Sequence, residues 1–253
     1  MLYFIAFFKQ NMKRILLIAL LCIGATGFLY TSLGYFNGPY NNILTAQNIK
    51  NTDKYGIDVS HHQKQINWKE VSKEPIEFVY IKATEGATYV DPMFHKNATD
   101  AKKAGLLIGA YHFFRMTSSV ENQFKNFKSA MSKHQMDLIP MIDVETDDGK
   151  PRKEVQKALE KFIQLIKAEY GVSPMIYGTQ RSYNTFCAPD FNKYHLYIGR
   201  YSTKHPEIKG KGTCTIWQYT ETGRIKGINK NVDKCRFNPK YSIKDILLPK
   251  KSQ

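Results

Sequence analysis

The chain has 253 residues, 42% of them hydrophobic, so it can bury a large core in one large domain or in two small ones. Lys and Arg number 37 against 22 Asp and Glu, and the formal charge of +15 favours an anionic partner such as nucleic acid, acidic lipid or an anionic wall polymer. Because the lysines are scattered rather than interleaved with aromatic residues, we expect no nucleic-acid partner.

The N-terminus has the pattern of a membrane-targeting segment. Lys13 and Arg14 precede a long apolar run, and no further charge occurs before Lys50. A basic region followed by an apolar region directs a chain to the membrane, and about 20 apolar residues suffice to span a bilayer. We therefore predict a signal anchor over residues 1–36, with its basic end inside.

Other readings of this region stay open. The segment could instead be a signal peptide cleaved near residues 24–30, and Met12 is an alternative start to Met1. The polar residues 37–54 read as a linker. In either case the part that follows is expected outside the cytoplasm, either membrane-anchored or secreted.

Residues 55–249 are predicted to form one α/β domain. Apolar runs that end in polar residues predict eight strands: 55–60, 78–83, 106–113, 138–145, 174–177, 195–201, 215–219 and a last run that ends at Val232-Asp233. Helices are predicted after Asn67, over 91–104, after Ser118-Ser119, from Pro151 to Gly171, and over 180–186. Strands and helices alternate early but not late, which favours an eight-stranded barrel that lacks helices late in the chain.

The fourth predicted strand carries two acids one residue apart. Because side chains alternate along a strand, Asp143 and Glu145 share a face with Ile139 and Met141. Two acids at the end of a buried strand are unusual, because burying an unpaired charge costs free energy. A catalytic acid and base pair at the mouth of a barrel would explain their presence.

Three cysteines follow the predicted membrane segment. In a symmetric hairpin centred between residues 224 and 225, Cys214 and Cys235 lie opposite each other, so we predict a disulfide between them and a free Cys187. Three free thiols are the alternative. The sequence has no CxxC motif and no grouping of His and Cys, so no metal site is predicted.

Polar side chains recur where the predicted strands end, and in a barrel these ends converge on one face. They include Asp58, Lys82 with Glu85, Tyr111 with His112, Asp143 with Glu145, Tyr177, Arg200 with Tyr201, Gln218 and Asp233. Acids can transfer protons and stabilise cations, and aromatic side chains stack on sugar faces. This set, with Trp217, therefore points to a sugar polymer as substrate.

Six motifs in this order resemble glycoside hydrolase family 25, the Chalaropsis-type lysozymes or N-acetylmuramidases, over roughly residues 55–240. The motifs are Gly56-Ile-Asp-Val-Ser60, Tyr80-Ile-Lys-Ala-Thr-Glu-Gly86, Gly109-Ala-Tyr-His-Phe113, Asp143-Val-Glu145, Trp217-Gln-Tyr219 and Val232-Asp233. The resemblance implies a single flattened, irregular TIM-like β/α barrel. It also implies hydrolysis of the β-1,4 bond between N-acetylmuramic acid and N-acetylglucosamine in peptidoglycan.

The resemblance also implies roles for individual residues. Glu145 matches the general acid, and Asp143 matches the group that stabilises an oxocarbenium or oxazolinium ion. Asp58 and Asp233 match two further site acids that poise this pair. The implied substrate-binding residues are Tyr111, Tyr177, Trp217 and Gln218, with a place in the core as the alternative for Trp217. The sixth strand departs from the family, which usually carries Trp where this chain has Tyr197.

Two other functions remain open at this point. One is a non-catalytic module that binds peptidoglycan, and the other is a hydrolase of another N-acetylhexosamine polymer such as chitin. We expect a monomer that needs no cofactor and has peptidoglycan glycan strands as its partner. The sequence does not say whether its own wall or a foreign wall is the target.

Overall fold

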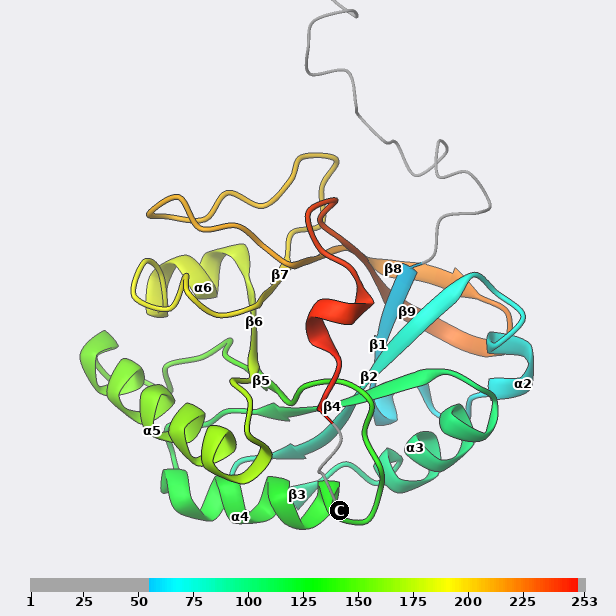
Figure 1. Ribbon diagram of the computed structural model, residues 1–253, viewed down its shortest axis with the longest axis horizontal. Coiled ribbons are helices and arrows are strands. Elements are labelled where there is room, and N and C mark those ends of the chain that lie inside the picture. Colours follow the sequence, from blue (N-terminus) through cyan, green and yellow to red (C-terminus); the bar gives the residue numbers. More distant parts are fainter. Residues whose placement is uncertain (1–54, 250–253) are drawn as a thin grey trace, which may run out of the picture. The chain divides into compact units, whose positions relative to one another are not determined.

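The computed structural model describes residues 55–249, in which eight strands close into a barrel (Figure 1). The ring consists of β1 (Tyr55–Val59), β2 (Ile76–Glu85), β4 (Leu107–Phe113), β5 (Met141–Asp143), β6 (Met175–Thr179), β7 (Leu196–Gly199), β8 (Ile216–Ile225) and β9 (Ile228–Phe237). A short strand, β3 (Tyr89–Val90), pairs with the end of β2 outside the ring. The predicted eight-stranded barrel is confirmed, although β5 is shorter than the predicted strand over 138–145.

The last strand runs against its neighbours. From β1 through β2 and β4 to β8 the adjacent strands are parallel, whereas β9 is antiparallel to both β8 and β1. Only Lys226 and Gly227 separate β8 from β9, and so short a connection can join only antiparallel strands. Gly227 has a φ of +91°, a conformation that glycine adopts without steric cost.

The helices cover the outside of the barrel in its first two thirds. They are α2 (Trp68–Val71), α3 (Phe94–Lys103), α4 (Val120–Met131), α5 (Arg152–Tyr170) and α6 (Gln180–Phe186), with 3-10 turns η1 (His61–Gln63) and η2 (Ile243–Ile246). The predicted caps are present: Asn67 and Ser119 accept hydrogen bonds from backbone amides, and Gly171 ends α5 with a φ of +73°. Among the described residues no α-helix follows α6, as the sequence predicted.

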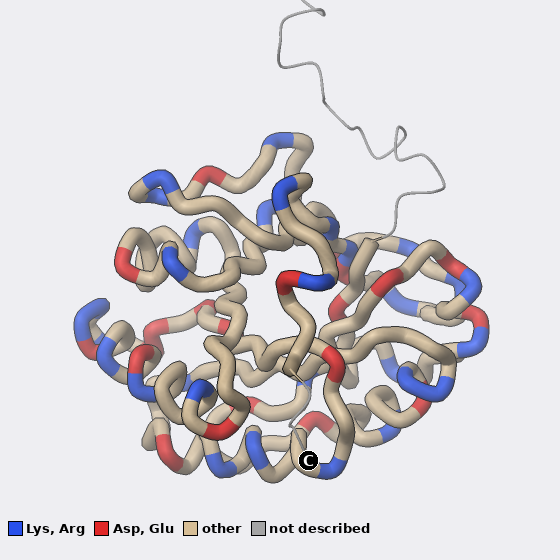
Figure 2. The backbone as a smooth tube through the Cα atoms, viewed as in Figure 1, with Lys and Arg blue, Asp and Glu red and all other residues tan. Residues whose placement is uncertain are grey.

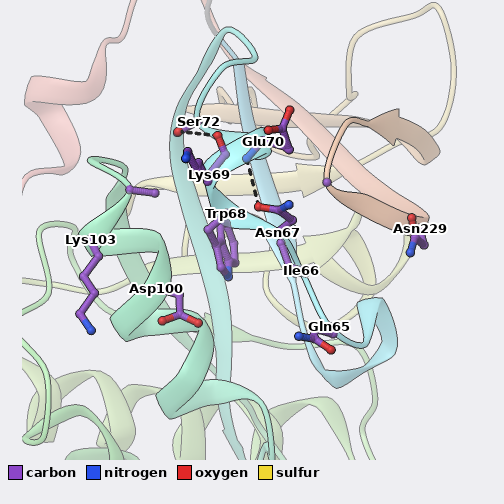
Figure 3. Close-up of a pocket in the computed structure, with 12 residues that line it drawn as sticks. Gln65, Ile66, Asn67, Trp68, Lys69, Glu70, Ser72, Asp100, Lys103 and Asn229 are labelled. Carbon is purple, nitrogen blue, oxygen red and sulfur yellow. Dashed lines mark hydrogen bonds between the residues drawn. The ribbon is translucent and has the colours of Figure 1, made fainter.

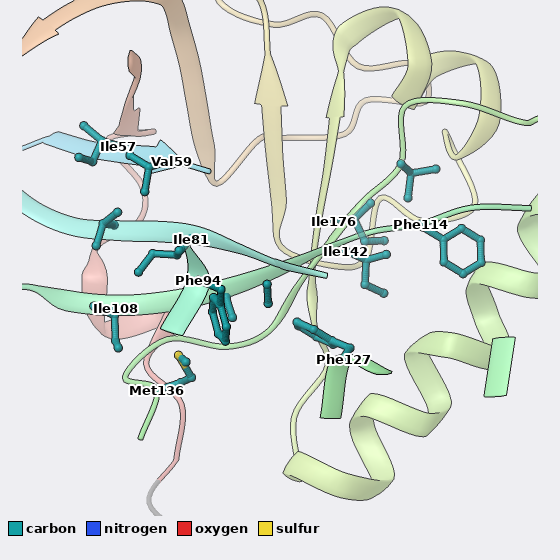
Figure 4. Close-up of a cluster of buried hydrophobic side chains, with 14 of the residues drawn as sticks. Ile57, Val59, Ile81, Phe94, Ile108, Phe114, Phe127, Met136, Ile142 and Ile176 are labelled. Carbon is teal, nitrogen blue, oxygen red and sulfur yellow. The ribbon is translucent and has the colours of Figure 1, made fainter. Parts of the chain in front are cut away.

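Alternation along the strands divides the core into two clusters. Ile57, Val59, Ile81 and Ile142 face outward and pack against the helices with residues such as Phe127 (Figure 4). The interior of the barrel is filled by a second cluster of mostly large side chains: Phe78, Tyr80, Met141, Met175, Tyr197 and Ile216. Ile246 of η2 joins this second cluster, and its carbonyl accepts a hydrogen bond from the backbone amide of Ile139, just before β5. The C-terminal segment therefore closes the end of the barrel where the parallel strands begin.

The predicted disulfide is wrong. The β8–β9 turn lies two residues later than the symmetric hairpin assumed, so Cys235 pairs with Gln218 rather than with Cys214. The thiols of Cys187, Cys214 and Cys235 are all free and buried. Burial raises the pKa of the Cys187 thiol to about 12, which keeps it protonated and unreactive.

The predicted membrane segment over 1–36 and the linker over 37–54 lie outside the described residues. Within residues 55–249, no helix has both the length and the apolar character needed to cross a bilayer. Figure 2 shows Lys and Arg spread over many separate helices and loops of this part.

Candidate active site

Four acids meet at the end of the barrel where the parallel strands finish. Asp143 ends β5, and Glu145 follows two residues later, where it hydrogen-bonds with Tyr177 of the neighbouring strand β6. Asp58 lies on β1 and Asp233 on β9, and the antiparallel register of these strands puts the two residues directly opposite each other. Closure of the ring therefore joins acids that lie 175 residues apart in the chain.

Asp58 is buried and held by neutral donors. Its Oδ2 accepts hydrogen bonds from the hydroxyl of Tyr197 at 2.6 Å and from Nε2 of Gln218 at 2.9 Å. Burial raises the pKa of the Asp58 carboxyl, and hydrogen bonds from Tyr197, Gln218 and Asp233 oppose that rise. The arrangement fixes the Asp58 carboxylate in one orientation.

Gln218 connects Asp58 to the tyrosines of the site. Its Oε1 accepts hydrogen bonds from the hydroxyls of Tyr177 at 2.8 Å and Tyr201 at 3.1 Å, while its Nε2 donates to Asp58. The neighbouring position is Gly199, where a Cβ atom would lie 2.9 Å from Oε1 of Gln218 and 3.0 Å from the hydroxyl of Tyr177. A side chain at residue 199 would therefore displace this network.

Asp143 is the most unusual of the four acids. It is 6% exposed, and its Oδ1 is buried without a hydrogen-bond partner among the described residues. Burial raises the pKa of Asp143 well above its usual value, and the negative charge of Glu145 raises it further, while Lys82 lowers it. Stabilising a cation, the role that the family resemblance implies for Asp143, requires an ionised carboxylate, whereas in the free protein its surroundings favour the protonated form.

Glu145 differs from Asp143 in its access to solvent. The residue is exposed at the rim of the barrel, yet the surrounding protein removes enough water from its carboxyl to raise the pKa. A hydrogen bond from Tyr177 opposes the rise, and the charge of Asp58 adds to it. Glu145 can thus both hold a proton and reach a large ligand outside the barrel.

Asp233 and Tyr111 complete the set at the barrel mouth. Partial burial, followed by the charge of Asp58, raises the pKa of Asp233 to about 9. Tyr111 lies on the inner face of β4 with the second core cluster, where burial raises the pKa of its hydroxyl and the charges of Asp58 and Asp143 raise it further. The Tyr111 hydroxyl therefore stays a neutral donor at any physiological pH.

Trp217 is the one predicted site residue that the structure places elsewhere. It belongs to the outer core cluster, is 2% exposed, and its Nε1 donates to the carbonyl of Arg200 at 2.8 Å. The guanidinium of Arg236 lies over its ring, 4.6 Å from the centroid. Gln218 faces the barrel interior, so Trp217, the preceding residue on the same strand, must face outward. This position agrees with the core alternative that the sequence left open for Trp217.

The structure also adds residues whose contacts the sequence did not reveal. Tyr197 was noted only as a departure from the family, yet its hydroxyl is the closest donor to Asp58. Lys82 is buried beneath the rim, where its Nζ lies 2.7 Å from Glu85 and 4.9 Å from the ring centroid of Phe113. Both could have been found from alternation, because Tyr197 and Lys82 share the inward face with Gly199 and Tyr80.

No group of three or more His, Cys, Asp and Glu side chains within residues 55–249 is arranged to hold a metal ion. A pocket of about 870 Å³ lies away from the four acids, between α2, α3 and the β8–β9 turn (Figure 3). Its lining includes Trp68, Asp100 and Lys103 but none of the predicted site residues. The barrel mouth, not this pocket, therefore carries the acids that could perform catalysis.

Comparison with known proteins identifies the family of this chain. Residues 57–228 match the family described as Glycosyl hydrolases family 25. The chain belongs to family 25 of the glycosyl hydrolases. The resemblance inferred from its six motifs is therefore confirmed, and the protein is a glycoside hydrolase.

Individual relatives of this family 25 chain cover most of its described part. The uncharacterized protein YegX of Escherichia coli K12 is 34% identical over 189 residues, which are 73% of this chain and 69% of YegX. Lysozyme M1 of Streptomyces globisporus is 33% identical, over 72% of this chain and 67% of its own. The crystallised family 25 glycosyl hydrolase from Bacillus anthracis is 32% identical with a TM-score of 0.69, over 76% of this chain and 93% of that one.

Proposed function

We propose that this family 25 hydrolase is a muramidase that cleaves the β-1,4 bond between N-acetylmuramic acid and N-acetylglucosamine in peptidoglycan. The proposal is carried by the pairing of an exposed Glu145 with a buried Asp143 that has one unpartnered oxygen. It is supported by relatives named as lysozymes, including lysozyme M1 of Streptomyces globisporus and an autolytic lysozyme of Clostridium acetobutylicum.

Glu145 is assigned the role of general acid. A general acid must hold a proton near neutral pH and reach the leaving oxygen. Burial raises its pKa, which shifts Glu145 towards the first requirement, and its exposure at the rim meets the second. Tyr177, which also hydrogen-bonds Gln218, positions the Glu145 carboxyl by a hydrogen bond.

Asp143 is assigned the stabilisation of the positive charge that develops on the sugar. In the free protein its Oδ1 lacks a donor, and burial favours the protonated form. The N–H of the substrate's 2-acetamido group would supply that donor. A hydrogen bond to the charged form lowers the pKa of a carboxyl, so bound sugar would shift Asp143 towards ionisation, with the charge of Lys82 assisting. Asp143 could then stabilise an oxocarbenium ion or an oxazolinium ion formed by the acetamido group.

The remaining predicted site residues support this pair. Asp58 on β1 and Asp233 on β9 lie opposite each other, and their carboxyl groups bring negative charge to the region beneath the rim. Tyr111 and Tyr177 present hydroxyl groups on the inner face, where a sugar can meet them, and the buried Gln218 positions the Tyr177 hydroxyl by accepting its hydrogen bond. We place the working enzyme outside the cytoplasm, as a monomer, either anchored through residues 1–36 or released after cleavage.

One digestion tests the proposal. Purified protein is incubated with purified peptidoglycan, and the new reducing ends are identified by mass spectrometry. Reducing-end muramic acid is expected. Reducing-end glucosamine or cleavage of chitin would point instead to another N-acetylhexosamine hydrolase, and pelleting with the wall without cleavage would point to a binding module.

A matched pair of variants tests the role of Glu145. Glu145→Gln should lower kcat by at least about 100-fold, because general acid catalysis contributes about 10²–10⁴-fold, and should leave wall binding intact. The control is Glu160→Gln, which removes an exposed carboxylate from α5 and should leave kcat unchanged. Undiminished activity of Glu145→Gln removes that residue from its assigned role.

A further inference from the structure

A second pocket begins at the active-site acid Asp233. It has a volume of about 560 Å³ and lies between η1 and the hairpin formed by β8 and β9. Its lining residues are His62, Gln63, Glu221, Arg224, Asn229, Lys230, Asn231 and Asp233. We call it the hairpin pocket. Because Asp233 lines both this pocket and the acid cluster, a group attached to a sugar at the barrel mouth can enter the pocket directly.

The walls of the hairpin pocket are fixed to each other. Nε2 of Gln63 in η1 donates to the carbonyl of Asn231 at 2.9 Å, and the Gln63 Oε1 accepts from the amide of Ser60 at 2.9 Å. The turn of the hairpin is tied to the barrel because the amide of Asn67 donates to the carbonyl of Gly227 at 2.9 Å. A ligand that enters this pocket therefore meets a preformed surface, which reduces the entropy lost on binding.

The lining is polar and carries both charges. Arg224, Lys230 and Glu221 are exposed, and no ion pair joins any of them to another described residue. Amide groups of the Asn side chains add hydrogen-bond donors and acceptors. The lining contains no Trp, Tyr or Phe, and thus lacks the flat aromatic surfaces on which sugar rings stack. Its chemistry fits a short peptide with carboxylate and ammonium groups better than another sugar.

We propose that the hairpin pocket binds the short acidic peptide carried by the lactyl group of muramic acid, an inference that rests on the proposed muramidase function. Arg224 presents a planar fork that can bind a carboxylate through two hydrogen bonds, and Lys230 adds a second cation. Glu221 is placed to receive the ammonium group of a diamino acid in the same peptide. The enzyme then prefers peptide-bearing strands to bare glycan.

Two substrates and two double variants test this proposal. The substrates are soluble glycan strands that carry their peptides and the same strands after an amidase has removed the peptides. The pocket variant is Arg224→Gln/Lys230→Gln. The control variant is Lys153→Gln/Lys157→Gln, which removes the same charge from exposed positions of α5.

For the pocket variant, kcat/KM on peptide-bearing strands should fall about tenfold, mainly through KM, because two charge-assisted hydrogen bonds are lost. Its kcat/KM on bare strands should not change, and the control variant should match wild type on both substrates. An equal fall on both substrates, or no fall on peptide-bearing strands, overturns the proposal.

A binding measurement separates this inference from the muramidase function itself. If the wild-type protein cleaves neither substrate, the proposed muramidase function is refuted, but the peptide pocket is not. Calorimetry with a soluble muramyl peptide requires no turnover, so it still tests whether the hairpin pocket binds the peptide. We expect binding to wild type and to the control variant, and about tenfold weaker binding to the pocket variant. Equal affinity in all three proteins overturns the pocket assignment.

Discussion

Replacing Tyr197 by Phe removes one hydroxyl from the barrel interior and with it the 2.6 Å hydrogen bond to Asp58. The ring itself stays, so the change leaves no large cavity. A hydrogen bond to a charged group contributes about 1.5–3 kcal/mol, against about 1 kcal/mol for a neutral pair. The cost of Tyr197→Phe should therefore depend on whether Asp58 is ionised.

The sign of this pH dependence follows from the raised pKa of Asp58 in the folded protein. A carboxyl whose pKa is higher in the folded than in the unfolded state loses stability as the pH rises through that interval. Loss of the Tyr197 donor raises the folded-state pKa of Asp58 further. If the hydrogen bond stabilises ionised Asp58 by about 1.4 kcal/mol more than protonated Asp58, the rise is about one pH unit. The destabilisation should grow from about 1 kcal/mol at acid pH to about 2–3 kcal/mol once Asp58 ionises.

Urea denaturation below the ordinary pKa of aspartate and again in mildly alkaline buffer measures this difference. Tyr80→Phe is the matched control, since the Tyr80 hydroxyl is also inside the barrel but donates to the uncharged carbonyl of Ile139 at 3.0 Å. That variant should lose about 1 kcal/mol at both pH values. A cost for Tyr197→Phe that is the same at both pH values, or one that Tyr80→Phe reproduces, contradicts the reasoning.

Three further variants test other parts of the structure. Asp233 has a folded-state pKa of about 9, so its carboxyl should reduce stability as the pH rises from about 4 to about 9, by at most about 1.4 kcal/mol per pH unit. Asp58, Asp143 and Glu145 add slopes of the same sign, so Asp233→Asn should make the pH dependence of thermal melts shallower, and an unchanged slope would contradict the assignment. Gly199→Ala, which pushes a Cβ to 2.9 Å from Oε1 of Gln218, should lower kcat by about tenfold or more, and normal kcat would show that the network adjusts. Trp217→Phe should lower the free energy of unfolding by about 1–3 kcal/mol in a urea titration and leave KM unchanged. A raised KM with normal stability would indicate instead that Trp217 contacts the substrate.

Alternation along the strands explains how much of the site was predictable. It put Asp143 and Glu145 on one face; in the structure β5 ends at Asp143, and Glu145 follows the strand and hydrogen-bonds with Tyr177. The same rule chooses between the two alternatives for Trp217, because Trp217 and Gln218 are consecutive in a strand and cannot both face the interior. Once Gln218 is assigned to the site, Trp217 belongs to the outer core.

Other features depend on distances that no local pattern contains. The pairing of Cys235 with Gln218 depends on the exact position of the β8–β9 turn, and a two-residue difference there separates Cys214 from its expected partner. The rise in the pKa of Asp143 depends on its depth of burial in the folded barrel, which adjacent residues in a sequence do not reveal. Membership of family 25, in contrast, was evident from six short motifs in order.

The partners of Asp58 come from strands late in the chain, and this has a consequence for how the enzyme is made. β1 pairs on one side with β9, and the hydrogen bonds to Asp58 from Tyr197 and Gln218 span 139 and 160 residues of chain. A ribosome must therefore synthesise the chain at least as far as Gln218 before Asp58 acquires these partners, and as far as β9 before Asp233 lies opposite Asp58. Contacts between distant residues form slowly because a long loop must close first. A chain that stops before β9 thus has no assembled centre for hydrolysis, so a cell that makes this protein is exposed to its activity only after these late strands are synthesised.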